Sequence, residues 1–164
     1  MSRSKMLAKQ VGEHAVASEL GRRGVVATTF SGNMPDFDIL GIRADNSQIQ
    51  VQVKATRAPE KSWFCGDSKS FFEIEATDGQ ERVVSHRAPY PNDFYWVFVQ
   101  IATERSEDQF FILTDTELVS LSRQIADAWL AGKAGRRLSV NPVVLDTVAL
   151  APFRDKWDTI AVPK

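Results

Sequence analysis

The chain has 164 residues, of which 43% are hydrophobic and 25% are charged, and these values are ordinary for a soluble globular protein. The formal net charge of −1 argues against a dedicated nucleic-acid coat protein, because such proteins carry a basic excess that neutralises phosphate. A chain of this length can bury a two-layer core, so we expect a single domain over residues 1–164.

Cysteine content and apolar runs indicate where the protein works. Cys65 is the only cysteine, so no intramolecular disulfide can form, and no base lies near it in sequence to support thiol chemistry. The charged start, Met1–Lys5, has no apolar run behind it and does not resemble a signal peptide. The longest apolar run, Phe94–Val99, is too short to cross a bilayer. We therefore expect a cytoplasmic protein that has no membrane partner.

The first two predicted elements are a helix over residues 4–24 and a short strand over residues 25–30. Within the first segment, Leu7, Val11 and Ala15 recur at helical spacing, and glycines near its end can stop the helix. The second segment is rich in valine and threonine and ends in phenylalanine, which favours a strand.

A hairpin is predicted next, after a turn at residues 31–35. Its first strand is led by Asp38, and its second strand follows a turn-like segment at residues 44–47. On the second strand, apolar and polar residues alternate without a break. The polar face consists of Gln48, Gln50, Gln52 and Lys54. A carboxylate, an amide oxygen and an ammonium can therefore converge at one end of the hairpin.

The remaining elements complete an α/β pattern. The strand predicted over 94–103 is nearly all apolar, which predicts burial on both faces. A capping box at Thr114–Glu117 opens a helix that ends near Gly132. The order α-β-β-β-β-β-β-α predicts a mixed central β-sheet flanked by helices. The other predicted elements are strands over 70–76 and 109–113, and a short helix over 152–160 that docks Trp157.

The hairpin and the helix before it resemble a known superfamily. Pro35-Asp36 followed by Gln52-Val53-Lys54 resembles the signature of the PD-(D/E)XK nucleases, with Gln where Glu or Asp is usual. The segment Gly12–Leu20 looks like the first helix of that family, and the Gln-x-Lys form is similar to that of Mrr-type restriction nucleases. The resemblance covers about residues 5–57. It implies a restriction-endonuclease-like fold with an α-β-β-β core.

The resemblance also implies a metal-dependent DNA endonuclease of the restriction, repair or junction-processing type. The implied cofactor is Mg²⁺, with Mn²⁺ as a substitute. Lys54 would orient the attacking water and steady developing charge. Glu13 or Asp36 would complete the charge of the metal site. The implied metal ligands are the carboxylate of Asp38, the side-chain oxygen of Gln52 and the backbone carbonyl of Val53.

Each of these residues also has an ordinary structural interpretation. Asp38 can be a strand-start residue that accepts turn amides, and Gln52 can be a polar residue on a solvated strand face. Lys54 can be a surface lysine that discourages edge pairing, and Glu13 an exposed helix residue. Gln52 keeps open a rival function from another class, a catalytically silent protein of this fold that binds DNA or another protein.

Basic residues that follow the hairpin predict contacts with nucleic acid. Arg57 and Lys61 come soon after Lys54 and are the candidates for phosphate binding. Trp63, in a polar setting, is the one tryptophan for which base stacking is an alternative to a place in the core. The implied partner is double-stranded or branched DNA, and many relatives act as homodimers.

The nuclease hypothesis makes a demand on the register of the hairpin. Asp38 shares a face with Gln52 and Lys54 only if it lies opposite an even-numbered residue of the second strand. Opposite Gln52 or Lys54, the connecting loop has an odd length, whereas a four-residue turn at 44–47 places Asp38 opposite Val53, on the wrong face. We therefore predict an odd loop or a β-bulge near Asp38. The Asp38 carboxylate should then lie within about 6 Å of the Gln52 amide oxygen.

Overall fold

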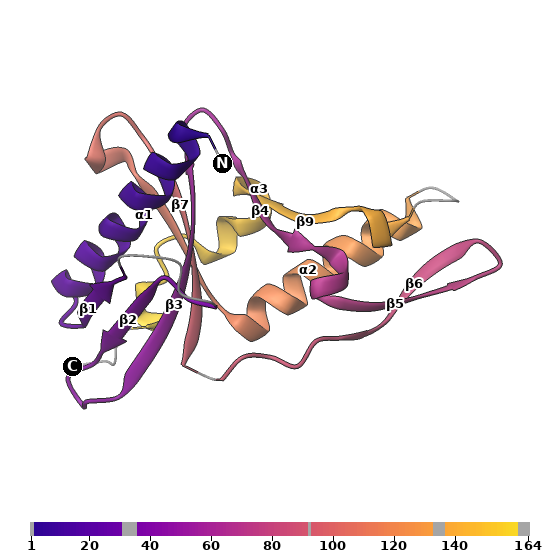
Figure 1. Cartoon of the computed structure of the whole chain (residues 1–164), viewed down its shortest axis with the longest axis horizontal. Helices are drawn as coiled ribbons and strands as arrows, with labels where there is room; N and C mark the ends of the chain where they lie inside the picture. The colour runs from indigo at the N-terminus through magenta and orange to yellow at the C-terminus, as the bar shows by residue number, and fades with distance from the viewer. Residues whose placement is uncertain (1, 31–35, 92, 133–136, 161–164) are drawn as a thin grey trace.

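The computed structural model describes residues 2–30, 36–91, 93–132 and 137–160. The turn predicted at residues 31–35 lies outside the described residues. Figure 1 shows a β-sheet with helix α1 (Arg3–Arg22) along one side, and an arm that extends away from the sheet and contains helix α2 (Asp115–Ala131). None of the helices in these ranges is long and apolar enough to span a bilayer.

The central sheet has five strands in the order β1-β2-β3-β7-β8. Strands β3 and β7 run parallel, and every other neighbouring pair is antiparallel. The sheet is therefore mixed and carries helices on its faces, which confirms the predicted fold class. Its strands are β1 (Val26–Thr29), β2 (Ile39–Ile42), β3 (Gln48–Arg57), β7 (Phe94–Ile101) and β8 (Gln109–Thr114).

Helix α1 packs on one face of the sheet through small and apolar residues spaced one turn apart. These buried residues are Ala8, Gly12, Val16 and Leu20. They share a core cluster with the odd-numbered apolar residues of β3. At Gly12 the helix lies so close to β3 that an added Cβ would come 2.4 Å from the Cβ of Ala55. The absence of a side chain at this position sets how near the helix approaches the sheet.

The other face of the sheet is covered by α2 and by aromatic residues of β7. Phe94, Trp96 and Phe98 belong to a core cluster that also contains Leu118 of α2. All eight residues of β7 are buried, which confirms the prediction for this strand. The capping box at the start of α2 is also present: the Thr114 hydroxyl accepts from the Glu117 backbone N–H, and the Glu117 carboxylate accepts from the Thr114 backbone N–H.

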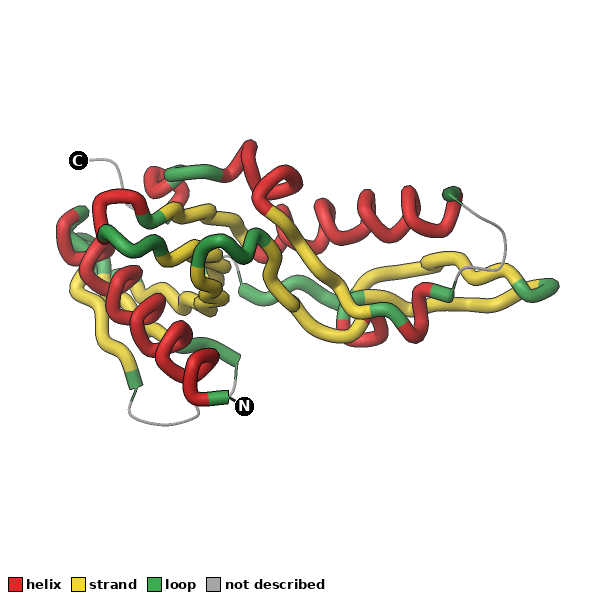
Figure 2. The backbone as a smooth tube through the Cα atoms, turned by 90° about the horizontal axis from the view of Figure 1, so that it is seen from above, coloured by secondary structure: helices red, strands yellow, loops and turns green. Residues whose placement is uncertain are grey.

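Two ribbons of strands lie outside the central sheet (Figure 2). Strand β4 (Ser62–Asp67) pairs with β9 (Pro142–Asp146), and neither was expected from the sequence. The strand expected over 70–76 lies at β5 (Phe72–Thr77), which forms a hairpin with β6 (Gln80–His86). Helix α3 (Thr147–Leu150) follows β9 directly.

The end of the chain differs from the predicted helix over 152–160. It forms two short 3-10 turns, Ala151–Phe153 and Trp157–Thr159, because Asp155 between them has a φ of 53°, which an α-helix does not accommodate. The docking of Trp157 is confirmed, since the residue is buried and its ring packs under the guanidinium of Arg23 at 4.6 Å.

Candidate active site

The hairpin of β2 and β3 has the register that the proposed site requires. Ile42 lies opposite Gln48, and the ladder continues to the pair Ile39 and Val51. One residue further along, Asp38 falls opposite Gln52. The connecting loop is therefore the segment 43–47, whose odd length agrees with the prediction.

Asp38 lies at the edge of β3, where β2 begins. Its backbone N–H donates to the Val51 carbonyl at 2.9 Å, and its Oδ2 accepts from the Val53 backbone N–H at 2.8 Å. The side-chain amide of Gln52 donates to the same Oδ2 atom. Asp38 is only 9% exposed. Its carboxylate therefore occupies the position that a neighbouring strand would take beside β3, which fixes it far more firmly than a residue that only accepts turn amides.

Two residues of α1 complete a cluster of charges around Asp38. Lys9 Nζ lies 3.2 Å from Asp38 Oδ1 and 3.5 Å from Glu13 Oε1. Lys9 and Glu13 are four residues apart on the helix and therefore point to the same side. Glu13 Oε1 is buried and accepts no hydrogen bond from the described residues. The Lys9 ammonium is thus a cation shared by two carboxylates.

Burial and mutual repulsion shift the pKa values in this cluster. Desolvation raises the pKa of Glu13 above its usual value, and the negative charge of Asp38 raises it further. Burial acts to lower the pKa of Lys9, but the negative charges of Asp38 and Glu13 outweigh it, so that this pKa is raised. Both shifts mean that the carboxylates favour a cation or a proton between them.

An open cleft of about 420 Å³ begins beside this cluster. Strand β2 pairs with β3 only as far as Val51, and beyond the Val53 N–H, which donates to Asp38, no strand among the described residues pairs with this edge of β3. Residues of the first turns of α1 and of strand β4 line the cleft together with this part of β3. Most ionisable residues among the described lining of the cleft are basic, and Glu60 is the one acid among them. The basic residues are Lys5, Lys9, Lys54 and Arg57.

Gln52 and Lys54 line the floor of the cleft from the same face of β3. Lys54 Nζ lies 5.8 Å from the centre of the Trp96 ring on β7, which holds the ammonium over the aromatic face. Among the described residues, no carboxylate forms an ion pair with Lys54. The ammonium is therefore available to a ligand in the cleft.

The two remaining metal-site candidates differ in position. The Val53 N–H donates to Asp38, and because the N–H and C=O of one strand residue point to the same side, the Val53 carbonyl also points toward Asp38. Asp36 is exposed, has a left-handed φ of 77°, and makes no ion pair or hydrogen bond with any described residue. The structure thus brings Glu13, and not Asp36, to Asp38.

The predicted nucleic-acid contacts also divide. Arg57 lines the cleft at the end of β3, whereas Lys61 is exposed and outside the cleft lining. The alternative of base stacking by Trp63 is wrong, because β4 directs this side chain into the core. There it is 3% exposed, and its indole N–H donates to the Val99 carbonyl at 3.2 Å.

Cys65 is the next inward-facing residue of β4. Burial raises the pKa of its thiol to about 12, so the sulfur stays protonated at neutral pH and cannot act as a thiolate nucleophile. The expectation from sequence that this cysteine takes no part in catalysis agrees with its place in the core.

Sequence reasoning missed two lysines of the site. Lys9 and Lys5 precede Glu13 by four and eight residues, so helical spacing places all three on one side of α1, and this spacing was the available signal. The described residues contain no group of three or more His, Cys, Asp or Glu side chains with the arrangement of a metal site. Among the described residues the cluster has two carboxylates, Asp38 and Glu13, so a further ligand from this part of the chain would be an amide oxygen or a backbone carbonyl.

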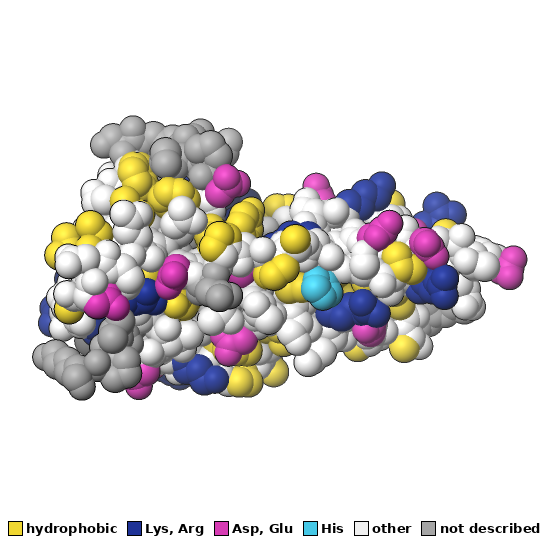
Figure 3. Space-filling view, turned by 90° about the horizontal axis from the view of Figure 1, so that it is seen from below, with side chains coloured by type: hydrophobic (Ala, Val, Ile, Leu, Met, Phe, Trp, Pro, Cys, Tyr) yellow, Lys and Arg dark blue, Asp and Glu magenta, His cyan; other side chains and the backbone are white. Residues whose placement is uncertain are grey.

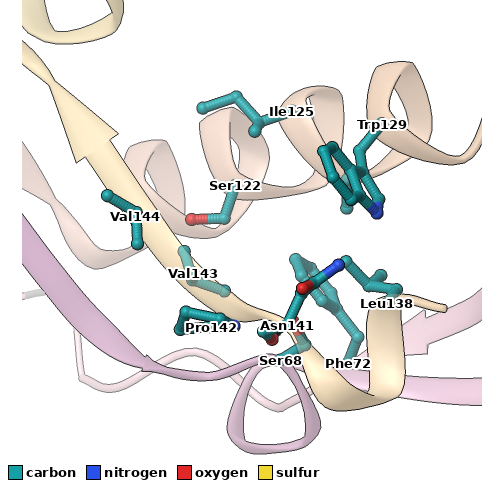
Figure 4. A pocket seen from close by; sticks show the side chains of 11 residues that line it. Ser68, Phe72, Ser122, Ile125, Trp129, Leu138, Asn141, Pro142, Val143 and Val144 are labelled. Atoms are coloured by element: carbon teal, nitrogen blue, oxygen red, sulfur yellow. Dashed lines mark hydrogen bonds between the residues drawn. The ribbon is translucent and has the colours of Figure 1, made fainter. Parts of the chain in front are cut away.

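A separate apolar cavity of about 280 Å³ lies between α2 and β9 (Figure 4). Its described lining includes the buried Ser122 hydroxyl, which has no hydrogen-bond partner among the described residues, but no ionisable side chain. Cleavage of a phosphodiester requires groups that hold charge, so this cavity is not a candidate for that chemistry.

Basic side chains are not concentrated on every face. On the described surface seen from below in Figure 3, Lys and Arg are interspersed with Asp and Glu and form no continuous basic area. The predominance of basic residues in the cleft is therefore a local feature rather than a general property of the surface.

Comparisons with known proteins add a weak likeness of fold. The sequence matches no protein-family model and no curated protein. The structure is similar to that of a bacterial homing endonuclease, I-Ssp6803I, with a TM-score of 0.44 and 15% sequence identity, over 71% of this chain and 73% of that one. Likeness at this level does not transfer an activity from one protein to another.

Proposed function

We propose that this protein is a metal-dependent endonuclease that hydrolyses DNA phosphodiester bonds, with a PD-(D/E)XK-type site in one domain over residues 1–164. The observation that carries the proposal is that the buried carboxylate of Asp38 and the half-buried carboxylate of Glu13 both lie against Lys9, which lines a cleft rich in lysines. The carboxylates suit a divalent cation, and the lysines suit the phosphates of DNA.

The position of the Lys9 ammonium supports the fit of a divalent cation to this cluster. Its ammonium already lies between Asp38 and Glu13, and the Glu13 Oε1 atom is buried and has no hydrogen-bond donor among the described residues. A Mg²⁺ or Mn²⁺ ion would be held by Asp38 and Glu13, with the Gln52 side-chain oxygen and the Val53 carbonyl as neutral ligands. When bound, the ion would supply Lewis-acid activation of a phosphate and of water.

The chain's own residues contribute binding and orientation. Lys5, on α1, and Arg57, at the end of β3, both line the cleft and would hold phosphates that flank the scissile bond. Lys54, whose ammonium lies over Trp96 and has no carboxylate partner in the described part of the chain, would orient the attacking water and stabilise charge on the phosphate oxygens. By alternation along β3, the Ala55 N–H points to the free edge and can donate to the same phosphate.

One observation favours the silent-fold alternative. The Lys9 ammonium lies within ion-pair distance of both Asp38 and Glu13, as in a permanent structural ion pair. In that case the cleft would bind DNA through its lysines but would not cut it. The two functions therefore differ in whether a divalent cation can displace Lys9.

The test is incubation of the protein with supercoiled plasmid and with four-way-junction DNA, in Mg²⁺, in Mn²⁺ and in EDTA. We expect cleavage with either metal and none in EDTA. Lys54→Ala should abolish cleavage while leaving the melting temperature nearly unchanged, because this half-buried strand side chain packs mainly through its contact with Trp96. Binding without cleavage would support the silent-fold alternative. Cleavage by Lys54→Ala at the wild-type rate would exclude this site.

A further inference from the structure

An aromatic side chain lies at the rim of the cleft with most of its surface exposed. Phe64 is 59% exposed and lines the same cleft as Gln52 and Lys54. Its neighbours Trp63 and Cys65 point into the core, so alternation along β4 turns Phe64 outward. Isolated exposed apolar residues are common, but this one stands beside the groups proposed to bind a polyanion.

The local backbone fixes where Phe64 points. Phe64 lies directly opposite Val144 of β9, which is 43% exposed, so the two form an apolar pair on the outer side of the ribbon. The pairing register shifts between Phe64 and Gly66, which marks a β-bulge immediately after the aromatic residue. Bulges of this kind frequently redirect a side chain next to an active site.

Charge complementarity selects the occupant of this apolar surface. The cleft below Phe64 is lined by Lys5, Lys9, Lys54 and Arg57, which attract a chain of phosphates. The group attached to a phosphate chain that can cover an aromatic ring is a nucleobase. Within a duplex both faces of each base are covered by its neighbours, so only an unpaired or flipped base can stack on a side chain. The cleft volume of about 420 Å³ falls within the size range of sites that enclose one small molecule.

We propose that Phe64 is a specificity-determining residue that stacks on an unpaired base beside the phosphate held by Lys54. The protein would thus prefer DNA that contains unpaired nucleotides, such as a single strand or a bulge, over a continuous duplex. This inference rests on the proposed function, because it takes DNA as the ligand of the cleft.

The test measures binding of three fluorescent oligonucleotides: a perfect duplex, the same duplex with a three-nucleotide bulge, and a single strand. Phe64→Leu keeps an apolar side chain but removes the ring, and Phe64→Tyr keeps the ring. We expect Phe64→Leu to weaken binding of the single strand and the bulge by about 5- to 100-fold, with little effect on the duplex, and Phe64→Tyr to retain wild-type affinity. Val144→Ala, across the ribbon, should have little effect on any of the three.

A second readout reports stacking directly. 2-Aminopurine placed in the bulge should lose fluorescence on binding to the wild type and to Phe64→Tyr, and less so with Phe64→Leu. Equal affinity of Phe64→Leu and wild type for the bulge, or equal weakening on all three oligonucleotides, would overturn the stacking role while leaving the nuclease proposal intact. A folded wild-type protein that binds none of the oligonucleotides would overturn both.

Discussion

The side-chain amide of Gln52 donates a hydrogen bond to the carboxylate of Asp38. The contact joins two residues fourteen positions apart in the chain, which the register of β2 and β3 places opposite each other. It turns the amide nitrogen of Gln52 toward Asp38. Because a side-chain amide binds Mg²⁺ or Mn²⁺ through its oxygen, binding of either cation here requires the amide to rotate and present that oxygen.

This relationship predicts how metal affects stability. Mn²⁺ at about one hundred times its dissociation constant should raise the melting temperature of the wild type by about 5–10 °C, because it binds only the folded state. Gln52→Glu should lower the melting temperature without metal, since it adds a third carboxylate to the cluster of Asp38 and Glu13, and it should enlarge the rise with Mn²⁺. Asp38→Asn should remove most of the rise. Differential scanning fluorimetry over a Mn²⁺ titration measures all three.

The matched control is Asp36→Asn, which changes an exposed carboxylate that forms no hydrogen bond or ion pair with the described residues. It should leave the Mn²⁺ response as in the wild type. If Asp36→Asn lost as much of the Mn²⁺ response as Asp38→Asn, Asp36 would also be required for metal binding, and the site built on Asp38 and Glu13 would be wrong.

Lys9 is predicted to compete with the metal. Its ammonium lies within ion-pair distance of both Asp38 and Glu13, so a divalent cation at these carboxylates must displace it. Lys9→Met keeps a long apolar stem and removes the charge, and it should strengthen Mn²⁺ binding about tenfold, which corresponds to roughly 1.4 kcal/mol. Isothermal titration calorimetry measures the affinity.

The control for this change is Lys5→Met, one turn earlier on the same side of α1, which lines the cleft but forms no ion pair among the described residues. It should change Mn²⁺ affinity much less than Lys9→Met does. If Lys9→Met binds no Mn²⁺ and only becomes less stable, the ion pair is structural and the silent-fold alternative gains support.

The Asp38–Gln52 contact was accessible from sequence because it depends on short-range features. An alternating strand fixes which residues share a face, and loop parity fixes the register across one hairpin. The ribbon of β4 and β9 was not accessible, since its partners are about 80 residues apart and β9 is a short apolar run with a proline at its start. Because the ribbon was not predicted, base stacking stayed open as an alternative for Trp63, whose burial depends on that ribbon.

The role of Lys9 shows a second limit of prediction from sequence patterns. Its spacing from Glu13 is visible in the sequence, but its role depends on how closely α1 approaches β3. That distance is set by Gly12, whose lack of a side chain is noticed only when Ala55 is seen opposite it. From the sequence, Gly12 is only a weak helix former, whereas in the structure it allows the close contact that positions α1 and the site.

Gly12→Ala is therefore predicted to disturb both stability and the site. The added methyl group would lie 2.4 Å from the Ala55 Cβ, so the helix must move away from the sheet, at a cost of about 1–3 kcal/mol. Movement of α1 should also weaken Mn²⁺ binding, because Glu13 is the next residue. Gly21→Ala is the matched control on the same helix: nothing lies within 4 Å of its added Cβ, so it should stabilise by up to about 1 kcal/mol. Urea denaturation measures both. Destabilisation by Gly21→Ala as large as by Gly12→Ala would refute the close-approach explanation.

Because of Asp115, we predict that the free energy of unfolding falls as the pH is lowered into the acid range. This residue is buried, and it accepts hydrogen bonds from Arg87, from the Tyr90 backbone N–H at 2.8 Å and from the Trp96 indole N–H at 2.8 Å. Burial acts to raise the pKa of Asp115, but these donors outweigh it, so that its pKa is lowered. Through Trp96, this carboxylate also supports the ring over which Lys54 lies.

A lowered pKa means that the folded state binds the proton more weakly than the unfolded chain. The stability supplied by the Asp115 carboxylate is then complete above the unfolded pKa of about 3.9 and is lost as the pH falls through the folded value. Asp115→Asn should cost about 3 kcal/mol at pH 7, where it breaks a buried ion pair, and the difference from the wild type should narrow below pH 3.9. Asp127→Asn, which removes an exposed i,i+4 pair with Arg123 on the same helix, should cost less than about 0.5 kcal/mol. Thermal unfolding at pH 7 and at pH 3 measures both variants. A gap between Asp115→Asn and wild type that stays equally wide at the two pH values would show that the carboxylate's charge contributes nothing, and that the side chain acts through its shape alone.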